Sequence, residues 1–171
     1  MSRIVVCPLP RLAETVESCG ARHLVTLINT QTLVERPNDV RAADHLVIGV
    51  NDIADEVAGL IRPAESHVSE LLSFVGKWDR KAPLVIHCLA GISRSPAAAY
   101  VSLCSLRPDL DEAVVAQRLR QASPEATPNR RLIAVADTLL ARDGRMIKAI
   151  AGIGRGLDAA KGSVFGLAID A

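Results

Sequence analysis

Short, predominantly apolar runs recur along the first half of the chain. They cover residues 4–6, 24–28, 45–50 and 84–86, and proline, glycine or polar residues follow each of them closely. Runs this short are typical of strands, and a run without regular polar alternation is typical of a strand that is covered on both faces. The pattern therefore predicts four strands, with residues 84–86 in the central one.

Apolar positions recur at helical spacing between and after these runs. Residues 63–78 begin with a proline and then carry Val68, Leu71, Leu72, Val75 and Trp78 on one helical face. The same criterion predicts helices over residues 12–17, 96–106, 110–122 and 132–141, with Thr127-Pro128 as the cap and first-turn proline of the last. Strands that alternate with helices predict a single-domain α/β fold, in which helices flank both sides of a central, mostly parallel sheet.

The tail over residues 145–171 is rich in glycine and follows Asp143-Gly144, which ends the last predicted helix. Its apolar period is too weak to define an element, so the tail is either an added helix or a loose end. No repeat or low-complexity linker divides the chain. We therefore expect residues 1–144 to form the functional domain and residues 145–171 to be an addition to it.

The stretch from Lys81 to Ala99, KAPLVIHCLAGISRSPAAA, reads as a strand, a tight loop and a helix. A loop that opens into a helix N-terminus directs free N–H groups at one point, where the helix dipole favours negative charge. Gly91 allows the backbone to turn sharply, and Arg94 adds a planar fork that binds two oxygens of a phosphate. Cys88 stands at the floor of this cradle, where the same positive field favours a thiolate.

Composition shows that binding of an anion must come from this local site. The 20 basic and 19 acidic residues leave a net charge of +1, so no global field attracts the chain to nucleic acid or to a membrane surface. Aromatic residues make up only 2% of the chain, too few for a platform that stacks bases. We therefore expect neither nucleic acid nor a membrane as a partner.

Cysteine and histidine spacing indicates no metal site. The four cysteines form no Cys-x-x-Cys pair, and the histidines lie 20 or more residues apart, so we expect no metal and no cofactor. The start, MSRIVV, is unlike a secretory leader, and no apolar run reaches the length of a membrane span. These features favour a cytoplasmic protein with reduced thiols, which suits a catalytic thiolate.

The nine residues from His87 to Ser95, HCLAGISRS, resemble the signature loop of the cysteine-dependent protein tyrosine phosphatases. That loop reads His-Cys, five residues, Arg, then Ser or Thr, and the Ala-Gly-Ile-Ser-Arg-Ser core is most similar to the dual-specificity branch. We expect a bacterial member. The resemblance implies a phosphatase-like catalytic domain over residues 1–144, with the signature loop between a strand and a helix, and a phosphoester hydrolase that works through a phosphocysteine.

The resemblance also implies a role for each residue of the loop. Cys88 is the expected nucleophile, Arg94 binds the phosphate and stabilises its oxygens in the transition state, and Ser95 donates a hydrogen bond that eases departure of the thiolate. His87 supports the backbone and tunes the thiol from behind. Backbone N–H groups complete the cradle from Leu89, Ala90, Gly91, Ile92, Ser93 and Arg94. The other three cysteines, Cys7, Cys19 and Cys104, are expected to be packing residues.

A separate acid must protonate the leaving group from a loop that faces the cradle. Asp52 follows a predicted strand 36 residues before Cys88, and the dual-specificity enzymes carry their acid on a loop so placed. Asp55 and Glu56 are its rivals on the same loop. Because only position separates the three carboxylates, the sequence favours Asp52 and leaves Asp55 open.

Two other functions fit part of this pattern. A rhodanese-like sulfurtransferase also uses a loop cysteine, but its loop closes within fewer residues and needs no upstream acid. An inactive phosphatase domain that binds phosphorylated partners usually loses the cysteine or the arginine, and both are present here. The substrate stays open between phosphorylated proteins and small phosphoesters such as inositol phosphates, and so does the oligomeric state.

Overall fold

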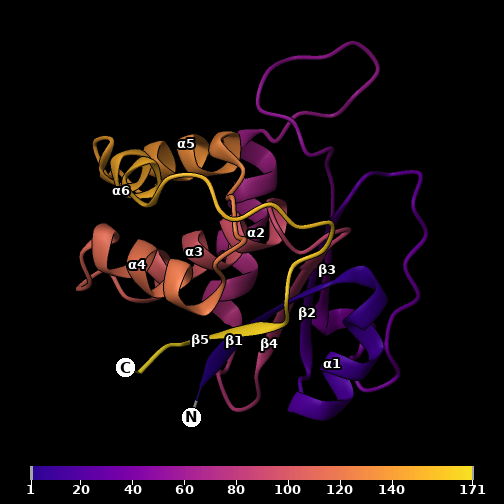
Figure 1. The fold of residues 1–171 in the computed structure, drawn as a ribbon. Helices are drawn as coiled ribbons and strands as arrows, with labels where there is room; N and C mark the ends of the chain where they lie inside the picture. The colour runs from indigo at the N-terminus through magenta and orange to yellow at the C-terminus, as the bar shows by residue number, and fades with distance from the viewer. Residues whose placement is uncertain (1, 171) are drawn as a thin grey trace.

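Five strands form one sheet in the order β3-β2-β4-β1-β5 in the computed structural model (Figure 1). The structure describes residues 2–170. Met1, which begins the predicted range 1–144, and Ala171, which ends the predicted range 145–171, lie outside it. The strands are β1 Arg3–Pro8, β2 His23–Ile28, β3 His45–Gly49, β4 Leu84–Cys88 and β5 Phe165–Ala168. β1 to β4 run parallel to one another, and β5 runs antiparallel to its neighbour β1. The predicted mostly parallel sheet is therefore confirmed.

Helices cover both faces of the sheet, as the alternating pattern predicts (Figure 1). α1 packs alone on one face, where Leu12 and Val16 contact the strand residues Val5 and Val85 in a small core. The other helices cover the opposite face and its larger core. The helices are α1 Leu12–Cys19, α2 Glu65–Lys77, α3 Arg94–Leu106, α4 Glu112–Ala122, α5 Arg130–Leu139 and α6 Arg145–Ile153, with short 3-10 turns at Leu9–Arg11 and Ala42–Asp44.

Four helix starts differ from the prediction by two residues each. α2 and α4 begin two residues later than predicted, at Glu65 and Glu112, and α3 and α5 begin two residues earlier. α3 begins at Arg94 rather than at Pro96, because a proline in the first turn removes an N–H that has no intrahelical partner anyway. α5 begins at Arg130, and its N-cap is Asn129, so the expected cap at Thr127-Pro128 is wrong by two residues. The Asn129 side chain accepts hydrogen bonds from Arg131 N and Leu132 N, which explains why the helix starts there.

The tail contains both an added helix, α6, and a strand that the sequence did not predict. β5 pairs with β1 at the edge of the sheet, in register from Arg3 opposite Ala168 to Val6 opposite Phe165. The described ends of the chain thus lie side by side (Figure 1), and Ile169 N donates to Ser2 O at 3.1 Å. The division of the chain at residue 144 stays a prediction about function, but the tail shares the sheet with the rest.

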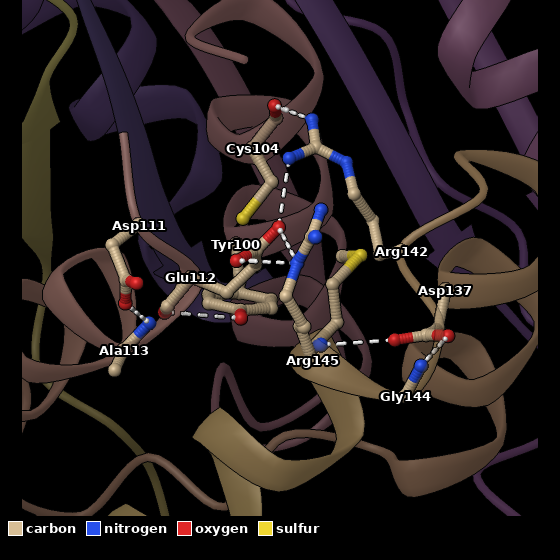
Figure 2. A network of polar contacts seen from close by, with 10 residues as sticks. Tyr100, Cys104, Asp111, Glu112, Ala113, Asp137, Arg142, Gly144 and Arg145 are labelled. Atoms are coloured by element: carbon tan, nitrogen blue, oxygen red, sulfur yellow. Dashed lines mark hydrogen bonds and ion pairs between the residues drawn. The ribbon is translucent and has the colours of Figure 1, made fainter. Parts of the chain in front are cut away.

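A buried ionic network attaches α6 to the helical layer (Figure 2). Arg142 Nη1 lies 2.7 Å from Glu112 Oε1, Arg145 Nε lies 3.2 Å from Glu112 Oε2, and Tyr100 donates its hydroxyl to the Glu112 carbonyl. Burial by itself raises the pKa of Glu112, but hydrogen bonds from its own backbone and from the two arginines outweigh it and hold the pKa below its usual value. These contacts hold α6 against α4 and so determine the position from which the chain continues after α6.

The topology brings the loops that carry chemistry to one edge of the sheet. Parallel strands end at the same edge, and β4 lies between β2 and β1, so the order of the strands reverses beside it. Such a reversal opens a crevice at the carboxyl ends of the strands. Cys88 ends β4 at this edge, and the loop that carries Asp52 follows β3 there. Over residues 2–170, none of the helices has both the length and the apolar character needed to span a membrane.

Candidate active site

Cys88 is the last residue of β4 and forms the floor of the loop. Its side chain is buried, and the residue is 2% exposed. The Sγ atom lies 3.1 Å from Ser95 Oγ and accepts a hydrogen bond from Gly91 N at 3.3 Å. A thiolate at this position is therefore within reach of a hydroxyl and of a backbone N–H, both of which stabilise negative charge on sulfur.

The carbonyl groups of the loop point outward, where N–H groups of three other segments bond them. Leu89 O accepts from Leu9 N at 3.1 Å, and Ala90 O accepts from Gly162 N at 2.7 Å. Ile92 O and Ser93 O accept from Thr127 N at 2.8 Å and Asn129 N at 3.2 Å. In a planar trans peptide the N–H points opposite to the carbonyl. The N–H of the residue that follows each of these carbonyls therefore faces the interior of the loop. The structure thus places backbone N–H groups where the sequence predicts a cradle.

Gly91 makes the tight turn of the loop. Its φ of 71° lies in the left-handed region that favours glycine. A Cβ atom here would lie 2.9 Å from Pro8 N and 3.1 Å from the Cys7 carbonyl carbon, so a side chain has no room against β1. Both the turn and the close approach therefore require glycine at this position.

Arg94 is a buried cation without a carboxylate partner in the described part of the chain. It is 6% exposed, and its Nη1 donates to Val50 O at 2.9 Å, which ties the guanidinium to the end of β3. Its Nε is buried and has no hydrogen-bond partner. An unpaired buried charge is costly, so this arrangement favours an anion beside Nε.

Asp52 is the carboxylate of its loop that touches the signature loop. Its Oδ1 accepts a hydrogen bond from Ser93 Oγ at 2.6 Å and another from Asn129 Nδ2 at 2.9 Å. Asp55 instead forms an exposed ion pair with Arg130 at 3.1 Å, and Glu56 is also exposed. The structure thus brings Asp52 to the cradle and directs Asp55 to a surface pair.

Asn129 is a site residue that the sequence analysis missed. Its Nδ2 donates to Asp52 Oδ1 and to Ile53 O, while its Oδ1 caps α5 and its backbone N–H bonds the signature loop. One buried residue thereby joins the acid loop, the signature loop and a helix. Nothing in the local sequence beyond a polar residue before a helix signals this role, because the partners lie 36 and 77 positions away.

His87 lies behind the nucleophile and is fully buried. Its Nε2 is 2.8 Å from Thr26 Oγ1, which is also 2.8 Å from His45 Nε2, and its Nδ1 is 3.4 Å from Cys88 O. Burial lowers the pKa of His87 to about 4 and outweighs the opposing bond to the Cys88 carbonyl, so the ring is neutral near neutral pH. Neutral His87 can donate from Nδ1 to the Cys88 carbonyl only if Thr26 donates to Nε2.

Two of the other cysteines are poor nucleophiles in this fold. Burial raises the pKa of Cys7 and of Cys104 to about 12, so both thiols stay protonated near neutral pH. Both belong to hydrophobic cores. Among residues 2–170 no cluster of three or more histidine, cysteine or carboxylate side chains is arranged to hold a metal ion.

No family model matches the chain, and no curated protein matches it by sequence. Solved structures of phosphatases share its fold. Human DUSP28 is 20% identical with a TM-score of 0.61, over 81% of this chain and 94% of that one. The Yvh1 phosphatase domain of Chaetomium thermophilum is 18% identical with a TM-score of 0.62, over 84% of this chain and 93% of that one.

A mouse putative dual specificity phosphatase, solved in complex with zinc tungstate, is 19% identical with a TM-score of 0.57. That match covers 81% of this chain and 80% of the mouse chain. This chain therefore has the α/β fold of the dual-specificity phosphatases.

Proposed function

We propose that this protein is a cysteine-dependent phosphoester hydrolase of the protein tyrosine and dual-specificity class. In the first step the Cys88 thiolate attacks phosphorus, an S–P bond forms and the bond to the leaving oxygen breaks, while Asp52 gives that oxygen a proton. In the second step water attacks the phosphocysteine and releases inorganic phosphate, and the thiolate is restored. Asp52, now ionised, accepts the proton of the attacking water.

The observation that carries this proposal is the buried guanidinium of Arg94, at the end of the loop that begins at Cys88. Val50 holds one end of the guanidinium, and Nε is left without a protein partner. An anion in the cradle would pair with this charge and with the inward N–H groups of the loop. Because these donors already stand in position, they stabilise the spread charge of a phosphoryl group in the transition state.

Ser95 and His87 assist the nucleophile in this scheme. Ser95 Oγ is close enough to donate to Sγ when the thiolate leaves phosphorus in the second step. His87 is neutral and bonds the Cys88 backbone, so it serves as a support rather than as a base.

The fold alone does not separate an enzyme from a binding module, since one protein of this fold is described as phosphatase-like. The juxtaposition of Cys88, Arg94 and Asp52 favours an enzyme.

The substrate on this proposal is a phosphorylated protein or a small phosphoester, with phosphotyrosine, phosphoserine and phosphothreonine all admitted. We also propose a cytoplasmic location, where the four thiols stay reduced, and action without a metal, nucleic acid or a membrane. Bacterial origin stays a prediction. A panel of phosphopeptides and inositol phosphates identifies the preferred class.

Release of inorganic phosphate tests the proposal. The wild-type protein is expected to hydrolyse aryl phosphates, and a chelator is expected to change nothing. Cys88→Ser is expected to lose turnover but still to bind orthovanadate, because the cradle survives. Transfer of sulfur from thiosulfate to cyanide, measured in parallel, would instead identify a sulfurtransferase. Turnover that persists in Cys88→Ser, or that a chelator abolishes, would contradict the proposal.

A further inference from the structure

Residues 154–164, which we call the C-terminal strap, cross from α6 to β5 along the outside of the signature loop (Figure 1). Gly162 N donates a hydrogen bond to Ala90 O at 2.7 Å. At the other end of the strap, Gly156 N donates to Thr127 Oγ1 at 3.1 Å. The strap is therefore bonded both to the signature loop and to the segment beside it.

The bond from Gly162 acts on the peptide unit that faces the nucleophile. The Ala90 carbonyl and the Gly91 N–H belong to one planar trans peptide and point in opposite directions. Gly162 holds the outer end of this peptide, and the inner end donates from Gly91 N to Cys88 Sγ. Aligned hydrogen bonds through a peptide polarise one another, so the outer bond both orients and strengthens the inner one.

Packing fixes the strap closely at this point. A Cβ atom on Gly162 would lie 2.6 Å from Gly91 O and 3.1 Å from the Gly91 carbonyl carbon, which are backbone atoms of the signature loop. The next residue is held as well, because Ser163 donates from both its backbone N–H and its hydroxyl to Glu125 Oε1. The space between the strap and the loop therefore has no room for a methyl group.

We propose that Gly162 is a positioning residue for the nucleophile, and that the strap is part of the phosphatase machinery rather than an appendage. The inference rests on the proposed function, in which the Cys88 thiolate attacks phosphorus. Gly162 acts through the Ala90-Gly91 peptide, which it holds with its N–H directed at Sγ. The tail that the sequence leaves without a role thereby sets the reactivity of Cys88.

Gly162→Ala in the full chain tests the inference, because the added methyl group must displace the strap or the loop. The first readout is the pH at which iodoacetate alkylates Cys88 at half its maximal rate, followed by mass spectrometry of the Cys88 peptide. We expect that pH to rise by about one unit and kcat/KM at neutral pH to fall about tenfold, as for a weakened hydrogen bond to a charged group. The substitution removes no titratable group around the signature loop, because His87, Arg94, Asp52 and the Cys7 thiol are all retained.

Gly152→Ala is the matched control. It makes the same exchange in α6, where the new Cβ meets nothing within 4 Å, and it is expected to behave as the wild type in both readouts. Ser163→Ala is the second variant, which adds no atom and removes one bond to Glu125. It is expected to raise the half-maximal pH in the same direction by a smaller amount, and it keeps the test decisive should Gly162→Ala fail to fold.

A folded Gly162→Ala with the wild-type alkylation profile and kcat/KM would overturn the inference. If Gly162→Ala does not fold, an unchanged profile in Ser163→Ala overturns it instead. Failure of the proposed function is a different result, in which the wild type releases no phosphate from any substrate. Alkylation needs no turnover, so the two outcomes are read separately.

Discussion

The Asn129 side-chain amide donates a hydrogen bond to Asp52 Oδ1 at 2.9 Å, although the two residues stand 77 positions apart in the sequence. The same amide also bonds Ile53 O, so it holds both the carboxylate and the backbone of the acid loop. This contact gives the proposed acid a fixed position beside Ser93. It leads to the first prediction.

Asn129→Ser is expected to keep α5 capped, because serine is also a good N-cap, but to remove the amide that holds Asp52. A misplaced acid affects poor leaving groups most, so we expect a loss of about tenfold on an alkyl phosphoester and little loss on nitrophenyl phosphate. Steady-state kinetics on both substrates measures this gradient. Asp111→Ser makes the same kind of exchange at the N-cap of α4 and is expected to show no gradient. An equal loss of activity on both substrates would show that Asn129 has only a structural role.

Asp52→Asn is expected to give the same gradient in a stronger form. A tyrosine leaves as a phenolate whose conjugate acid has a pKa of about 10, whereas serine and threonine leave as far more basic alkoxides. The variant should therefore slow phosphoserine and phosphothreonine most, phosphotyrosine less and nitrophenyl phosphate least. It should also remove the alkaline fall of the rate profile that reports an essential acid.

Asp55→Asn and Glu56→Gln are the controls for this prediction, and neither is expected to show the gradient. Asp55 pairs with Arg130 at the surface, so its loss should leave the cradle unchanged. A gradient in Asp55→Asn without one in Asp52→Asn would transfer the role to Asp55. If none of the three variants shows the gradient, the acid lies outside this loop.

Arg94→Lys keeps the positive charge but removes the planar fork. Lysine has its donors on a single nitrogen and cannot match two phosphate oxygens side by side as the fork does, so we expect kcat to fall by on the order of 100-fold, or ~3 kcal/mol of transition-state stabilisation. Orthovanadate binding, measured by calorimetry, should weaken in the same variant. Near-normal turnover would show that charge alone suffices.

His87 is expected to make the free energy of unfolding depend on pH at values above those at which carboxylates usually titrate. Its pKa is about 4 in the fold, below the ordinary value of about 6.5, so the unfolded chain binds the proton more readily between these limits. This contribution is complete above pH 6.5 and is lost as the pH falls towards 4, by on the order of 3 kcal/mol.

Urea unfolding of the wild type and of His87→Gln at pH 7 and pH 5 measures this contribution. Both proteins contain the same carboxylates, so the contribution of these groups to the free energy of unfolding cancels in the difference between the two proteins. His45 also has a pKa that burial lowers, and it stays in both proteins, so it cancels as well. A difference that does not change with pH would mean that His87 titrates normally.

Highly charged polyphosphates are expected to be poor substrates. Between Cys88 and Arg94 the loop carries only Leu, Ala, Gly, Ile and Ser, so it offers no further cation to neutralise neighbouring phosphates. Phosphate release from inositol hexakisphosphate should be slower than from a phosphotyrosine peptide at equal concentration. The reverse order would show that cations outside the loop reach the substrate.

The sequence by itself determined the features that depend on neighbouring residues. Cys88, Gly91, Arg94 and Ser95 lie within one strand-loop-helix unit, so their spacing predicted their convergence, and the structure places them together. The α/β class followed from the alternation of short apolar runs with helical periods. These signals are local, because a strand, a turn and a helix N-terminus each form from contiguous residues.

Only the tertiary structure decided which distant groups complete the site. Asp52 and Asp55 are the same residue type on one loop, and only the contacts with Ser93 and Asn129 distinguish them. β5 carries four residues with a weak pattern, and it becomes a strand because the edge of β1 supplies its hydrogen bonds. The hydrogen bond from Gly162 N to Ala90 O joins two segments far apart in the sequence, and α6 and β5 lie at the two ends of the strap that carries Gly162. Such contacts join residues far apart in the chain, and their free energy appears only once the sheet and the helices have packed.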